Sequence, residues 1–114
     1  MDHSASLATV PHDPRRNPSY PAKIHAYEGP HWQAVVAQAR SRVEAVRVAL
    51  EGMAEAARQS KLRLYHQMLG ALDQIEDMAK RLPGEVGDLY AEDRHKLEEA
   101  QAALDRLIAR FHQP

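Results

Sequence analysis

Apolar or small residues recur every three or four positions from Trp32 to Leu82, and no proline interrupts this stretch. The steps alternate between four and three residues, with one additional step of four between Leu64 and Met68. Such spacing places one apolar stripe along a helix that packs against other helices over its whole length. The pattern therefore predicts an all-α protein. The members of the stripe are Trp32, Val36, Ala39, Val43, Val46, Leu50, Met53, Ala57, Ser60, Leu64, Met68, Ala71, Ile75, Met78 and Leu82.

A further helix is predicted after a short break. Residues 82–84, Leu-Pro-Gly, end the first pattern, because proline and glycine together stop a helix and turn the chain. The next helix is expected to begin near Gly87, with Asp88 as its N-cap, and to run to about Phe111. Because a short connection makes helices antiparallel neighbours, this helix should fold back over residues 57–82. Its apolar positions are Tyr90, Leu97, Ala100, Leu104, Leu107 or Ile108, and Phe111.

Whether residues 32–82 form one helix or two decides the architecture. Residues 58–61 are polar but include neither glycine nor proline, and Gly52 and Gly70 weaken a helix without ending it. We therefore expect one helix of about 51 residues, which spans about 75 Å. The alternative is a break near residues 58–61, which gives helices of about 27, 22 and 24 residues and a compact three-helix bundle.

The continuous helix has a consequence for the first half of the stripe. The last helix cannot reach residues 32–56, so the side chains from Trp32 to Met53 need another cover. A second copy of the chain is the simplest cover, and it gives a homodimer of helical hairpins with a coiled-coil-like four-helix core. Residues 62–75 carry two adjoining apolar stripes, a face broad enough for two neighbours, which fits either the dimer or the three-helix bundle.

Residues 1–30 differ from the rest of the chain because they hold five of its seven prolines. Each proline fixes its own φ and biases the preceding residue toward extended conformations. We expect a proline-rich, extended or disordered arm at 1–30 and a helical domain at 31–114. Three residues of the arm, Tyr20, Ile24 and Tyr27, have enough apolar area to dock on a helix surface.

Composition narrows the functional classes. The chain has 15 Lys and Arg against 16 Asp and Glu, so no overall charge attracts it to nucleic acid or to an anionic membrane. It has no cysteine, which excludes disulfides and thiolate metal sites. The N-terminus lacks the features of a secretory signal, and no stretch is apolar enough to span a membrane. We expect a cytoplasmic protein whose partners include neither nucleic acid nor a membrane.

Glu92 and His95 form the best local pattern for a metal site. A glutamate and a histidine three positions apart lie on one helical face, as in carboxylate-bridged di-iron bundles. Neither lies on the apolar stripe of its helix, so we expect both to face water, and we expect no cofactor. A helical-bundle metalloprotein, whose His/Glu site is completed by oligomerisation, is the alternative hypothesis.

No nucleophile–base arrangement and no glycine-rich phosphate loop is readable, so we expect no enzymatic activity. The pattern favours a small helical protein–protein interaction module that self-associates and acts as an accessory subunit, adaptor or assembly chaperone. Its partners would be a second copy of the chain and another protein. The residues predicted to bind a partner are Tyr20, Ile24, Tyr27, Trp32, Val36 and Val43.

Overall fold

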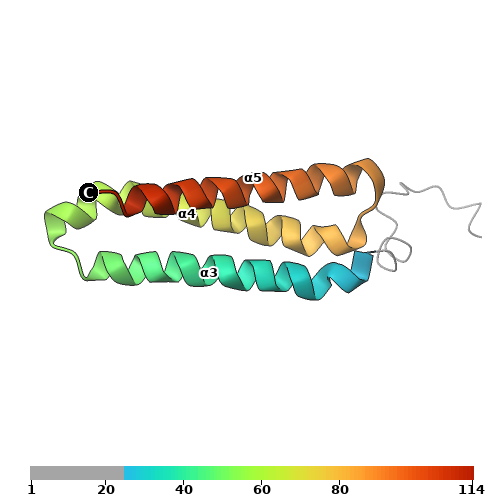
Figure 1. Ribbon diagram of the computed structural model, residues 1–114, viewed down its shortest axis with the longest axis horizontal. Helices are drawn as coiled ribbons and strands as arrows, with labels where there is room; N and C mark the ends of the chain where they lie inside the picture. The colour runs from blue at the N-terminus through green and yellow to red at the C-terminus, as the bar shows by residue number, and fades with distance from the viewer. Residues whose placement is uncertain (1–24) are drawn as a thin grey trace, which may run out of the picture.

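The computed structural model describes residues 25–114, which form three long helices lying side by side (Figure 1). The part of the chain that is described contains no strand, so the prediction of an all-helical protein is confirmed. The architecture is the three-helix bundle that the sequence left as the alternative. Its elements are the 3-10 turn η2 (Ala26–Glu28), α3 (Gly29–Glu51), α4 (Glu55–Arg81), the 3-10 turn η3 (Leu82–Gly84) and α5 (Gly87–Phe111).

The predicted continuous helix over residues 32–82 is wrong. Helix α3 ends at Glu51, and the chain turns over residues 52–54, where Ala54 is extended with ψ 152°. The break also lies earlier than the alternative position at 58–61. The turn brings α4 back along α3 (Figure 1). As a result, the apolar stripe of α3 is buried within one chain. The reason for expecting a dimer, an uncovered stripe, is thereby removed.

All three helices contribute to one apolar core. Helix α4 packs along both α3 and α5, which explains why its apolar face is broader than theirs. Leu69, in the predicted second stripe, is nevertheless 36% exposed. Burying a side chain such as Ile75 or Leu97, neither of which is exposed, contributes about 1.5–3 kcal/mol. The buried apolar residues are Trp32, Val36, Ala39, Val43, Val46, Leu50, Met68, Ile75, Met78, Ala79, Leu82, Leu97, Ala100, Leu104 and Phe111.

The predicted antiparallel pairing of the last two helices is confirmed, since α4 and α5 pack along each other. At one end of the pair, Lys61 of α4 donates hydrogen bonds to the backbone carbonyls of Phe111 and, at 2.8 Å, of Gln113. Its ammonium also lies 5.1 Å from the centroid of the Phe111 ring. Lys61 therefore places a positive charge at the C-terminus of α5, where the helix dipole favours one.

Helix α5 spans Gly87–Phe111, as predicted, but its N-cap differs from the prediction. Val86, not Asp88, is the N-cap residue, and no side chain caps the helix. Gly87 has φ 63°, a left-handed conformation that glycine adopts because it has no Cβ. Asp88 lies instead in the first turn of α5, where the helix dipole favours a negative charge.

The predicted arm at 1–30 overlaps the described residues only at its end. Residues 26–28 form a 3-10 turn, and α3 already begins at Gly29. Pro30 lies in the first turn of the helix, where its missing N–H leaves no hydrogen bond unmade. The prediction of an extended or disordered conformation for residues 1–24 lies outside the described residues.

Candidate functional site

A polar cluster ties η2 to α3 and α5 at one end of the bundle. Glu28 Oε1 accepts hydrogen bonds from Trp32 Nε1 at 3.1 Å and from the Tyr90 hydroxyl at 2.5 Å. The His25 ring stacks on Tyr90, with centroids 4.0 Å apart and planes 8° from parallel. His25 Nδ1 also lies 3.6 Å from Glu28 Oε2.

These contacts change the acid–base properties of two residues in the cluster. Burial, with a further effect of the hydrogen bond to Glu28, raises the pKa of Tyr90 to about 12. For Glu28, burial alone would raise the pKa, but the hydrogen bonds from Tyr90 and Trp32 and the nearby His25 outweigh it and lower the pKa. A glutamate that is held ionised and a tyrosine that is held neutral are stable partners. The cluster is therefore a structural clip and is not poised for proton transfer.

Asp93 is a buried acid that the sequence analysis did not single out. It is 1% exposed, its Oδ2 has no hydrogen-bond partner among the residues that the structure describes, and its Oδ1 lies 3.9 Å from Lys96 Nζ. The burial of Asp93 could have been predicted from the sequence, because Asp93 lies between Tyr90 and Leu97 on the apolar stripe of α5. Its neighbours in sequence, Glu92 and His95, are exposed.

The exposure of Glu92 and His95 confirms the expectation that both face water. His95 pairs with Glu99 at 3.2 Å on the surface of α5, where its side chain is 70% exposed. Within residues 25–114 no group of three or more His, Asp or Glu side chains is arranged to hold a metal ion. The alternative hypothesis of a metalloprotein thus finds no site in the described part of a single chain.

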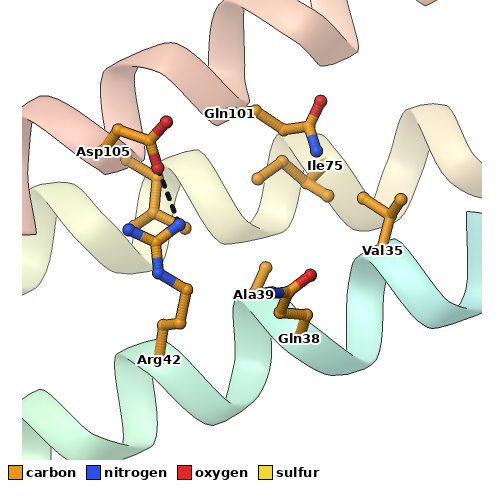
Figure 2. Close-up of a pocket in the computed structure, with 8 residues that line it drawn as sticks. Val35, Gln38, Ala39, Arg42, Ile75, Gln101 and Asp105 are labelled. Atoms are coloured by element: carbon orange, nitrogen blue, oxygen red, sulfur yellow. Dashed lines mark hydrogen bonds and ion pairs between the residues drawn. The ribbon is translucent and has the colours of Figure 1, made fainter.

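A narrow cleft separates α3 from α5, and Ile75 of α4 forms its floor (Figure 2). Its volume is about 150 Å³, whereas pockets for drug-sized ligands hold about 300–1,000 Å³. Arg42 of α3 and Asp105 of α5 close one end with an ion pair of 2.7 Å, drawn as a dashed line in Figure 2. The cleft therefore has room for a few waters, and its only facing charges neutralise each other. The remaining side chains that line it are Val35, Gln38, Ala39, Gln101 and Leu104.

Two adjoining pockets of about 370 and 430 Å³ lie on the surface between α4 and α5 and share Gln67 and Arg110. Together they form a shallow groove, which we call the basic groove. Each helix contributes residues at positions i, i+3, i+4 and i+7, which lie on one helical face. Half-buried apolar side chains lie between exposed arginines. The lining residues are Ser60, Arg63, Leu64 and Gln67 of α4 and Ala103, Arg106, Leu107 and Arg110 of α5.

The residues predicted to bind a partner fall into three groups. Tyr20 and Ile24 lie outside the described residues. Tyr27 lies on η2 and is 76% exposed, so it is accessible to a partner. The remaining residues do not form a surface, because they face the chain's own helices in the core. These buried residues are Trp32, Val36 and Val43.

None of the described helices has an apolar segment long enough to cross a membrane. Comparisons of the chain with protein-family models, with curated proteins and with solved structures gave no match.

Proposed function

We propose that this chain is a small helical protein–protein interaction module, which serves as an adaptor or accessory subunit. The observation that carries the proposal is the basic groove, a shallow hollow between two packed helices that offers apolar and charged side chains together. Surfaces of this kind suit an amphipathic helix of a partner, which lays its apolar face between two helices. The narrow cleft between α3 and α5 is too small for such a role.

The other clusters of polar side chains support a structural role. Glu28, Trp32 and Tyr90 satisfy one another's hydrogen bonds, and Arg42 is paired with Asp105. Self-association, which the sequence suggested through the Trp32–Met53 stripe, loses its physical reason because the stripe packs in the chain's own core, where Met53 is partly buried and the other members are buried. We therefore propose that one folded chain presents its surface to a different protein.

Two measurements test this function. Light scattering coupled to size-exclusion chromatography is expected to give the mass of one chain. Capture of the tagged full chain from its native host, quantified by mass spectrometry, is expected to recover another protein at near-equal molar amount. A bait carrying Val48→Ala, a change at a 54% exposed position outside the groove, should recover the same protein. Recovery of the bait alone, with and without cross-linking, would contradict the proposal.

A further inference from the structure

The three arginines of the basic groove differ from the other described arginines in their surroundings. Arg63, Arg106 and Arg110 have no carboxylate within ion-pair distance among residues 25–114. Every other arginine in that range pairs with an acid, on its own helix or on a neighbouring one. Among residues 25–114, the arginines without an acid partner are thus gathered at one place, on a chain whose net charge is −1. The paired arginines are Arg40, Arg42, Arg47, Arg58, Arg81 and Arg94.

The sequence around these arginines shows why they stay unpaired. No Asp or Glu stands three or four positions before or after Arg63, Arg106 or Arg110, although such spacing supplies most of the other pairs. Arg106 and Arg110 are themselves four positions apart, so that two like charges lie one turn from each other. Arg110 lies in the last turn of α5, where the helix dipole favours a positive charge. Neither Arg63 nor Arg106 lies in the last turn of a helix.

The floor of the groove limits the kind of ligand that fits. Leu64, Ala103 and Leu107 are half-buried between the arginines, so a ligand must offer apolar groups beside its acids. The lining of each helix covers seven residue steps, or about 10 Å, which equals about two turns of a docked helix. Arg106 and Arg110 are about 6 Å apart along α5, close to the pitch of a helix that carries acids one turn apart.

We infer that the basic groove docks an acidic amphipathic helix of a partner protein, with its glutamates or aspartates on the arginines and its leucines on the floor. This inference rests on the proposed function and names the partner's chemistry. The chain's own first 24 residues are less suitable, because their three Lys and Arg outnumber their two Asp. A nucleic acid is less suitable too, because its phosphates need a longer contiguous basic surface than three arginines and do not pack on apolar side chains such as Leu64 and Leu107.

Binding of a synthetic peptide tests the inference directly. The probe is a fluorescent three-turn helical peptide with glutamates one turn apart and leucines beside them, and the matched peptide has glutamine in place of glutamate. Fluorescence anisotropy with the full chain is expected to show binding of the acidic peptide only. The groove variant, Arg63→Gln with Arg106→Gln and Arg110→Gln, should bind it about tenfold more weakly, because three exposed charge pairs are lost.

A matched variant controls for the change in net charge. Arg47→Gln with Arg58→Gln and Arg81→Gln removes the same charge from exposed arginines that pair with acids and lie outside the groove. This variant should bind the acidic peptide within about twofold of the unmodified chain. Circular dichroism of both variants must show the same helix content as the unmodified chain.

Four results would overturn the inference. The two peptides could bind equally, or the control variant could lose as much affinity as the groove variant. A single-stranded oligonucleotide could bind more tightly than the peptide and lose its affinity in the groove variant, which would assign the groove to nucleic acid. The unmodified chain could dimerise at high concentration while the groove variant stays monomeric, which would assign the groove to a second copy.

Capture from the native host separates this inference from the proposed function. If the unmodified chain and the groove variant recover the same protein equally well, the interaction function stands and the docking site is elsewhere. If the acidic peptide binds specifically to the groove but no protein is captured, the chemistry of the groove stands and the proposed function fails.

Discussion

Replacing Val43 with alanine tests whether the stripe of α3 is buried within one chain. Val43 is 3% exposed, and the change removes two methyl groups from the core. At about 0.8 kcal/mol per buried methyl or methylene, the lost transfer energy is about 1.6 kcal/mol, and a residual cavity brings the expected loss to about 2 kcal/mol. For a bundle of this size, such a loss lowers the midpoint of thermal unfolding by about 8–16 °C.

The matched control lies on the same helix. Val48 is 54% exposed, so Val48→Ala makes the same chemical change at the surface and should alter stability by less than about 0.5 kcal/mol. Thermal unfolding followed by circular dichroism measures both variants at two protein concentrations a hundredfold apart. A single-chain bundle has a midpoint that does not depend on concentration.

Two results would refute the reasoning. Equal destabilisation by Val43→Ala and Val48→Ala would show that α3 does not bury the face that carries Val43. A midpoint that rises with concentration would show that a second chain covers part of the core.

Three further predictions concern the clip and the turn. The pKa of Tyr90 is raised from its unfolded value of about 10 to about 12. The stability that Tyr90 contributes below about pH 10 should therefore be lost as the pH rises toward about 12. In an ultraviolet titration, Tyr90 should be the last tyrosine to ionise. The pKa of Glu28 is lowered in the folded chain. The stability that Glu28 contributes is therefore present above its unfolded pKa and is lost as the pH falls through its folded pKa. In urea unfolding, the difference in stability between the unmodified chain and Glu28→Gln should be larger at neutral than at acidic pH. Gly52 has φ −85°, and an added Cβ would meet its nearest atom at 3.7 Å. Gly52→Ala should therefore raise the free energy of unfolding by about 0.4–1 kcal/mol and leave the elution volume in size-exclusion chromatography unchanged. A shift of the variant to a larger species would show that glycine is needed to make the turn.

The pairing of α4 with α5 could be predicted because its signals are local. Pro83 and Gly84 stop a helix whatever surrounds them, and the apolar stripe that follows has the right length to return along α4. The apolar stripe also marks the interior face of α3, of α5 and of most of α4. At the start of α4 it does not, because Ala57 and Ser60 are exposed.

The turn at residues 52–54 could not be read from the same pattern. The steps Leu50, Met53 and Ala57 keep the alternation of three and four, so the stripe runs through the turn without a change of rhythm. Gly52 is the only local signal, and a single glycine costs a helix about 1 kcal/mol, which does not end it. The turn is favoured by tertiary packing, because it allows one chain to bury the stripes of both α3 and α4.

The basic groove could not be predicted from the net charge of the chain, because its arginines stand apart in sequence and gather only where two antiparallel helices pack.

The same arginines affect the stability of the unliganded chain. Arg106 and Arg110 repel each other at positions i and i+4, which destabilises a helix by a few tenths of a kcal/mol, whereas an acid four positions before Arg110 would form a favourable pair. Arg106→Glu should therefore stabilise the unliganded chain by about 0.5–1 kcal/mol in urea unfolding while it weakens binding of the acidic peptide. If the groove is only solvated surface, Arg106→Glu should stabilise the chain and leave its affinity for the acidic peptide unchanged. A variant that is more stable and binds the acidic peptide as tightly as the unmodified chain would therefore show that Arg106 has no role in docking.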